Sequence, residues 1–191
     1  MTVLGERLVE IVRGAPHLME VLNRVRDLEL PQWRVFSGAV YQAVWNAETG
    51  RDPAYGIKDY DVGYFDASDT SYEAEDVVIR RAAAALPAPL SELVEVRNQA
   101  RVHLWFEGKF GEPYTPLSNA DEALERFVAP AFAVAVRLEP DDSISWAAPF
   151  GLEDVFALRL RPNPRRGRAR GWDKAVASAR ARWPEIEVVE A

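Results

Sequence analysis

Hydrophobic positions in the first thirty residues recur at helical spacing, in two runs. The first run contains Val3, Leu4, Leu8, Ile11 and Val12, and the second contains Leu18, Met19, Leu22 and Val25. Gly14 to Pro16 separates the runs, since glycine and proline interrupt a helical pattern. The spacing therefore predicts a helical hairpin over residues 1–30.

The middle of the chain changes its pattern several times. Trp33 to Phe36 lead into the turn Ser37-Gly38, and the apolar positions from Val40 to Trp45 predict a short helix with that turn at its start. Asn46 to Gly56 is rich in Gly, Pro, Asn and Asp and is expected to be a loop. The alternation from Ile57 to Phe65 predicts a strand.

The rest of the chain alternates short strands with helices. Ser71 is a suitable N-cap for a helix through about Leu86, and Pro87 and Pro89 end it. Strands are expected over Leu93–Val96, Val102–Phe106, Ala131–Leu138 and Ile186–Val189. Further helices are expected from Ser118 and Asp121 through about Phe127 and from Trp172 to Trp183, with a loop over Pro162–Gly171.

Length and composition limit the classes of protein that remain. The 191 residues, 21.4 kDa, fit one globular domain, and a net charge of -7 argues against bulk coating of nucleic acid. With no cysteine, disulfides, thiolate catalysis and cysteine-ligated zinc are excluded. No apolar run reaches membrane-spanning length, and Met1 to Glu10 lacks the features of a secretory signal. A cytoplasmic protein without membrane contact is expected, and its oligomeric state stays open.

The first chemical candidate is the pair Asp59 and Asp61. On a strand, two residues separated by one position project from the same face, about 7 Å apart. Two unit negative charges at this separation repel by roughly 2.4 kcal/mol at an effective dielectric near 20. A divalent cation such as Mg²⁺ relieves that repulsion with oxygen ligands. The same spacing also occurs on solvent-facing strand edges, so the pair alone does not define a site.

Two further features favour a phosphate and metal site. Ser37-Gly38 stands at the start of a predicted helix, whose first amides can receive phosphate oxygens. Glu95 lies between Val94 and Val96 in a predicted apolar strand, where an unpaired carboxylate is costly to bury. Glu95 is therefore a candidate third metal ligand, and a glutamate on the exposed face of an edge strand is the alternative.

The order of these features resembles the DNA polymerase beta type nucleotidyltransferase superfamily. Longer strings look like a bacterial nucleotidyltransferase-like family: SGAVYQAVWN (37–46), GIKDYDVGYFD (56–66), SYEAEDVVI (71–79), VRNQARVHLWF (96–106) and APFGLEDVFALRLRPNP (148–164). The resemblance covers most of the chain. It implies an α/β (α+β) fold with a mixed central sheet flanked by helices, as one domain with the helical hairpin 1–30, a catalytic core 31–138 and a C-terminal extension 139–191.

The resemblance also implies a reaction. A nucleoside monophosphate would move from a nucleoside triphosphate to an acceptor, with Ser37 and Gly38 on the triphosphate. Asp59, Asp61 and Glu95 would hold two Mg²⁺ or Mn²⁺ ions. The sequence departs from the superfamily in the longer gap between Gly38 and Asp59, which the loop Asn46–Gly56 must absorb.

Other basic residues are candidates for substrate contacts. Lys58 is a possible phosphate ligand, and Arg101 can read a base or an acceptor. The arginine run suits phosphates or is a solvated loop; it comprises Arg159, Arg161, Arg165, Arg166, Arg168 and Arg170. The acceptor stays open between a small molecule, RNA and a protein. A non-catalytic nucleotide- or protein-binding module and a metal-dependent phosphohydrolase are the alternative functions.

Overall fold

The computed structural model describes residues 2–189. The chain starts with the predicted helical hairpin, α1 (Val3–Arg13) and α2 (Pro16–Arg26). The Thr2 hydroxyl accepts a hydrogen bond from the Gly5 amide and so caps α1. The apolar stripes of both helices are buried, including Leu8, Val12, Leu18 and Leu22, so the hairpin belongs to the main core.

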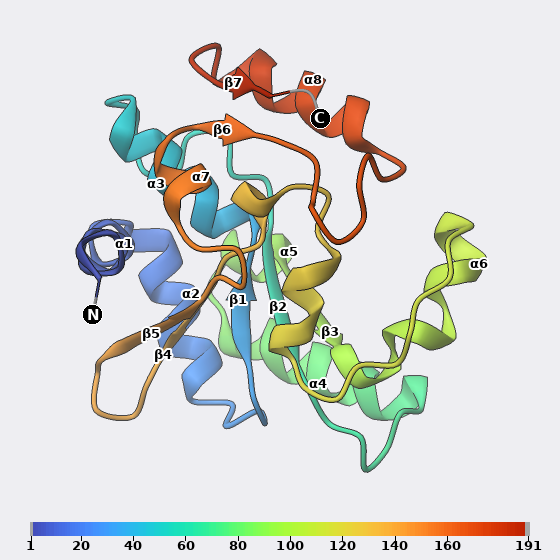
Figure 1. The fold of residues 1–191 in the computed structure, drawn as a ribbon. Helices are drawn as coiled ribbons and strands as arrows, with labels where there is room; N and C mark the ends of the chain where they lie inside the picture. The colour runs from blue at the N-terminus through green and yellow to red at the C-terminus, as the bar shows by residue number, and fades with distance from the viewer. Residues whose placement is uncertain (1, 190–191) are drawn as a thin grey trace.

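A five-stranded mixed sheet forms the centre of the molecule (Figure 1). Its strands are β1 (Arg34–Phe36), β2 (Tyr60–Tyr64), β3 (Val94–Asn98), β4 (Ala135–Leu138) and β5 (Ile144–Ala147). Their order is β3-β2-β1-β4-β5, with β2 and β3 parallel and the other neighbours antiparallel. The structure therefore confirms the predicted α/β (α+β) class with a mixed central sheet.

The two faces of the sheet have different environments, because alternate residues of a strand point to opposite sides. One face contributes Val35, Val62, Val96 and Val136 to the main core. Helix α2 contacts β4, α3 (Gly38–Glu48) contacts β1 and β2, and α4 (Tyr72–Ala85) contacts β3. The opposite face carries a smaller cluster around Phe36. Helices thus cover the first face, and the second remains partly open.

Several predicted elements differ from those observed. Val102–Phe106 is not a strand, because η1 (Gln99–Leu104) and α6 (Phe106–Phe110) occupy that segment. The Asn98 side chain accepts a hydrogen bond from the Ala100 amide and so caps η1. The predicted helix ending near Phe127 is a 3₁₀ helix, η2 (Asp121–Arg126). The strand predicted from Ala131 begins at Ala135, since the 3₁₀ turn η3 (Pro130–Phe132) precedes it.

The C-terminal third packs against α3. It contains α7 (Glu153–Phe156), β6 (Arg159–Leu160), α8 (Trp172–Arg182) and β7 (Glu187–Val188), and β6 and β7 pair in parallel. Earlier in the chain, the short helix α5 (Leu90–Leu93) precedes β3. The buried Trp183 indole donates to Asn46 Oδ1 at 2.9 Å. No helix within residues 2–189 has the length and apolar composition that crossing a bilayer requires.

Candidate functional site

Ser37 and Gly38 form the turn from β1 into α3. Ser37 has φ 49° and ψ -103°, a backbone conformation that is uncommon outside glycine and concentrates at functional sites. Its amide donates to Val134 O at 2.7 Å, which ties the turn to the residue before β4. Because the first amides of a helix have no intrahelical acceptor, the start of α3 is suited to an anion.

Asp59 lies directly beside this turn. A Cβ atom built on Gly38 would be 3.8 Å from Asp59 Oδ1 and 3.4 Å from Gln42 Nε2. Glycine therefore leaves an open approach between the start of α3 and the carboxylate. Although Gly38 and Asp59 are far apart in sequence, the fold brings them together.

The loop between α3 and β2 accommodates the long stretch of sequence between Gly38 and Asp59. Asn46 at the end of α3 donates to Pro53 O at 3.2 Å and to Tyr55 O at 2.9 Å. Gly56 has φ +72°, and a Cβ there would be 3.0 Å from the Trp183 ring. These contacts fold the loop back onto α3 and α8, so the chain returns to β2 with Asp59 next to Gly38.

Asp61 and Glu95 occupy one row across the sheet. Phe36 on β1 pairs with Asp61 on β2, and Asp61 pairs with Glu95 on β3, so all three side chains project from the partly open face. The strand was predicted from Ile57 but begins at Tyr60, so Asp59 lies immediately before β2 rather than within it. Both aspartates nevertheless lie at the same end of β2.

The charges in this row act on one another. The pKa of Asp61 is raised to about 6, chiefly because the surrounding protein removes hydration from a carboxyl group that still reaches the surface. The negative charges of Asp59 and Glu95 raise this pKa further, and the guanidinium of Arg97 lowers it. The acids are therefore close enough to repel one another, as a cation site requires.

The structure also shows how far a metal site is formed. Glu95 pairs with Arg97, with Glu95 Oε2 3.3 Å from Arg97 Nη2, and both side chains are exposed to solvent. Within residues 2–189, no three acidic or histidine side chains converge closely enough to hold an ion. Mg²⁺, however, usually takes one or two carboxylates and completes its shell with water and substrate phosphates. Asp59 and Asp61 fit that requirement, whereas Glu95 is held in an ion pair with Arg97.

Two sequence candidates have different surroundings from these acids. Lys58 is exposed on the loop directly before Asp59. Arg101 follows β3, beyond the far end of β2, and pairs with Glu75 at 2.5 Å, with both side chains largely buried. It also donates to Thr70 O at 3.1 Å. Arg101 is thus separated from the acid pair and held by structural partners.

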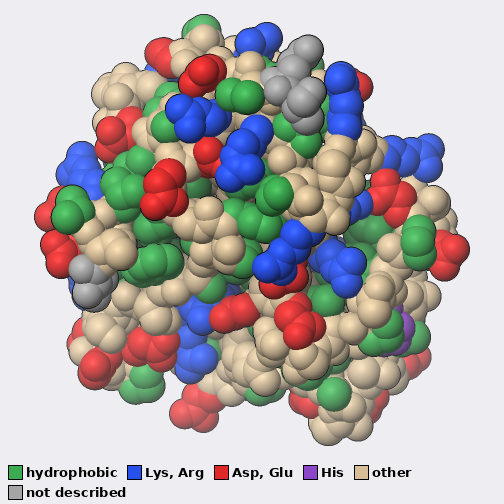
Figure 2. Space-filling model, viewed as in Figure 1, with side chains coloured by type: hydrophobic (Ala, Val, Ile, Leu, Met, Phe, Trp, Pro, Cys, Tyr) green, Lys and Arg blue, Asp and Glu red, His purple; other side chains and the backbone are tan. Residues whose placement is uncertain are grey.

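The arginine run is engaged in internal contacts. Arg161 pairs with Asp154 at 2.7 Å, and Arg170 donates to Phe110 O at 3.0 Å. The remaining pairs are Arg159 with Asp154 and Glu187, Arg165 with Glu125, Arg166 with Glu112, and Arg168 with Asp173. Figure 2 shows Lys and Arg side chains interspersed with Asp and Glu over the face of the molecule that is seen in Figure 1. The run therefore does not form a continuous basic surface for nucleic acid.

Three residues near the acids were missed by the sequence analysis: Gln42, Arg97 and Arg182. Gln42 lies one helical turn after Gly38, and Arg97 lies two residues after Glu95 on the same strand face, so spacing could have indicated both. Arg182 could not have been found in this way. Its Nη1 donates to Gln42 Oε1 at 3.1 Å across 140 residues of sequence.

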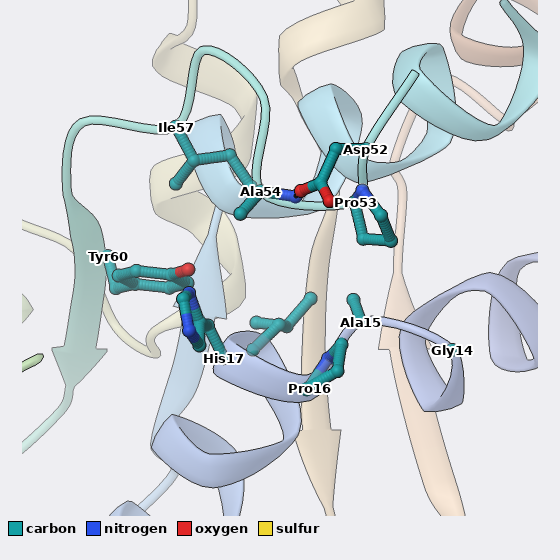
Figure 3. A pocket seen from close by; sticks show the side chains of 10 residues that line it. Gly14, Ala15, Pro16, His17, Asp52, Pro53, Ala54, Ile57 and Tyr60 are labelled. Atoms are coloured by element: carbon teal, nitrogen blue, oxygen red, sulfur yellow. Dashed lines mark hydrogen bonds between the residues drawn. The ribbon is translucent and has the colours of Figure 1, made fainter. Parts of the chain in front are cut away.

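An apolar cavity of about 270 Å³ lies on the helix-covered side of the sheet. Residues 14–18 between α1 and α2, residues 52–54, Ile57 and Tyr60 line it, and Figure 3 shows His17 and Tyr60 at this cavity. Tyr60 points to the opposite side of β2 from Asp61, because the two residues are neighbours in the strand. The cavity is therefore distinct from the acid row.

The mixed sheet, with a helix start beside Asp59 at one end of β2, fits a domain of the nucleotidyltransferase type. The chain belongs to the nucleotidyltransferase family whose model matches residues 23–188. It is similar to a structure solved by NMR and described as revealing a CCA-adding enzyme head domain, with a TM-score of 0.79 and 23% identity over 97% of this chain and 96% of that one. This likeness establishes the fold. No curated protein matches the chain.

Proposed function

We propose that this protein transfers a nucleoside monophosphate from a nucleoside triphosphate to an acceptor that is a small molecule, an RNA or a protein. The family and the fold support nucleotidyl transfer as the activity. The observation that carries the proposal is the position of Gly38, where a Cβ would be 3.8 Å from Asp59 Oδ1. A phosphate at the start of α3 would thus lie next to the acid pair.

Each residue of the site has a proposed role. The Ser37 hydroxyl and the Gly38 amide bind the β and γ phosphates at the start of α3. Asp59 and Asp61 would hold Mg²⁺ or Mn²⁺, which would supply positive charge to neutralise the phosphates during transfer. Lys58, exposed just before Asp59, is a second candidate for phosphate contact.

The chemistry is a displacement at the α phosphorus. The acceptor oxygen forms a bond to this phosphorus, the bond to the oxygen bridging the α and β phosphates breaks, and pyrophosphate leaves. The acceptor proton passes to Glu95 or to water. Because Glu95 is paired with Arg97 at 3.3 Å, this role requires the ion pair to open when substrate binds.

The same ion pair favours a second candidate function. If Arg97 keeps Glu95 neutralised, the site holds a nucleotide on Asp59, Asp61 and α3 without turnover. The protein would then be a nucleotide-binding module with the fold of a transferase.

Labelled nucleotides separate these functions. The purified protein is incubated with Mg²⁺ or Mn²⁺, a cell extract and each nucleoside triphosphate, labelled either at the α or at the γ phosphate. Transferase activity places the α label on an acceptor and the γ label in pyrophosphate. A phosphohydrolase leaves the α label on a free nucleotide. A binding module produces neither product, yet binds a non-hydrolysable triphosphate in calorimetry.

Matched variants assign any activity to the site. Asp59→Asn and Asp61→Asn should abolish transfer, whereas Asp69→Asn should leave it unchanged, because Asp69 is an exposed loop residue beyond the other end of β2. Transfer that survives both site substitutions would refute the assignment to this acid pair. An absence of both transfer and binding with every triphosphate would refute the proposed function as a whole.

A further inference from the structure

Arg182, at the end of α8, links three segments that surround the proposed phosphate site. Its Nη1 donates to Gln42 Oε1 on α3 at 3.1 Å and to Gly56 O in the loop before β2 at 2.7 Å. Gly56 is three residues ahead of Asp59. The guanidinium is therefore fixed between the first half of α3 and the segment that delivers the acid pair.

The acceptors around Arg182 are all neutral. Besides Gln42 and Gly56, they are Ser178 O, 3.2 Å from Nε, and Ser178 Oγ, 3.3 Å from Nη2. No carboxylate in residues 2–189 lies within 4.0 Å of its guanidinium, whereas Arg101 and Arg161 each pair with one. The guanidinium also interacts with the Tyr41 hydroxyl and lies over the Trp183 ring, with Cζ 4.7 Å from the ring centroid, so these partners of its positive charge are neutral as well.

The position of this charge relative to the site follows from Gln42. Its Nε2 donates to the Tyr41 hydroxyl at 3.3 Å and would be 3.4 Å from a Cβ on Gly38. Burial is the main reason that the pKa of the Tyr41 hydroxyl is raised; the charge of Arg182 lowers this pKa and the charge of Asp59 raises it. Arg182 and Asp59 thus flank the same hydroxyl, at the turn of α3 that follows Gly38.

We infer that Arg182 is a substrate-binding residue, and that its guanidinium contacts the terminal phosphates of a nucleoside triphosphate held at the start of α3. This inference rests on the proposed function. A cation held in place by neutral acceptors gains most from an anion, and a guanidinium forms strong charge-assisted hydrogen bonds to phosphate. Helix α8 thereby completes a site whose other residues come from α3 and β2.

The chain offers variants that separate phosphate binding from a purely structural link. Arg182→Gln removes the charge, and Arg182→Lys keeps it without the planar fork. Arg180→Gln is the matched control, because Arg180 is an exposed arginine on the same helix. Affinities for a non-hydrolysable nucleoside triphosphate, the diphosphate and the monophosphate are measured by calorimetry with Mg²⁺. The unfolding temperature of every variant is measured without ligand.

The expected result is a loss that depends on the number of phosphates. Arg182→Gln should weaken triphosphate binding by about 10-fold to 100-fold, the range for a hydrogen bond to a charged group. Monophosphate binding should change by less than about 2-fold, since the missing contact belongs to the terminal phosphates. Arg182→Lys should be intermediate for the triphosphate, and Arg180→Gln should match the wild type.

Two outcomes would overturn the inference while the proposed function stands. One is wild-type triphosphate affinity in Arg182→Gln. The other is an equal loss for all three nucleotides together with a lower unfolding temperature, which is the signature of a link that only holds α8 on the core. If the wild-type protein binds no triphosphate, the proposed function fails and the role of Arg182 fails with it.

Discussion

Asp61 and Glu95 are paired residues on the adjacent parallel strands β2 and β3, and both carboxylates project from the partly open face of the sheet. Two acids side by side on neighbouring strands destabilise each other unless a counter-charge is present. In this structure Arg97 provides part of that charge through its contact with Glu95. The arrangement suggests that a bound cation and its nucleotide would compete with Arg97 for the acids.

Neutralising Asp61 is expected to reduce transfer activity without reducing stability. Asp61→Asn removes a charge that repels Asp59 and Glu95, so the unfolding temperature without metal should be unchanged or up by about 1–2 °C. Transfer activity should fall by at least about 100-fold, because an amide is a poor ligand for Mg²⁺. Thermal unfolding and a labelled-nucleotide assay measure the two effects. A marked drop in unfolding temperature would show that the carboxylate has a structural role instead.

The raised pKa of Asp61 predicts a pH dependence of stability. The folded-state pKa of about 6 exceeds the ordinary aspartate value of 3.8, so the folded protein binds more protons between these values. The free energy of unfolding should therefore decrease as pH rises from about 4 to about 6, since the contribution of protonated Asp61 to stability is lost over this range. Asp61→Asn should flatten this part of the profile, and Mg²⁺ should diminish it in the wild type. Profiles of unfolding temperature against pH that coincide for the two proteins would contradict the prediction.

Gly38→Ala tests the approach between α3 and Asp59. The new methyl group would lie 3.8 Å from Asp59 Oδ1, in the space proposed for phosphate. Alanine favours a helix over glycine by roughly 1 kcal/mol, so stability should not fall. Nucleotide affinity should decrease by about 10-fold or more, as expected when a charged hydrogen bond is lost.

Gly108→Ala is the control for that substitution. Gly108 is also helical, and a Cβ there would contact nothing within 4 Å. Both variants should fold at least as well as the wild type, and only Gly38→Ala should bind nucleotide poorly. Calorimetry in parallel on the two proteins makes the comparison. Equal affinities would show that no phosphate lies against Gly38.

Substitution of Arg101 tests whether this arginine has a structural role or a substrate-binding role. Arg101→Met leaves the carboxylate of Glu75 buried without its partner, which typically costs about 3–5 kcal/mol. Denaturant unfolding should show a loss of this size, while nucleotide affinity per folded molecule should stay the same. Unaltered stability with weaker nucleotide binding would instead support the role that sequence patterns suggest for Arg101.

Much of the local structure was predictable because the signals are themselves local. The apolar stripes of α1 and α2 report which helix faces are buried, and Ser71 caps α4 as its position indicates. The alternation in β2 likewise reflects its two different faces. The strand predicted over Val102–Phe106 is wrong. The alternation of this segment is typical of a strand, but its first residues belong to the 3₁₀ helix η1, which Asn98 caps.

The sequence by itself determined most of the elements, the pair Asp59 and Asp61, and the glycine turn, because each depends on residues a few positions apart. Only the tertiary structure decided that Gly38 meets Asp59, that Arg101 is buried against Glu75, and that Arg182 reaches Gln42. These contacts join segments 21 to 140 residues apart, and such pairings depend on sheet register and helix packing. No periodicity along the chain encodes them.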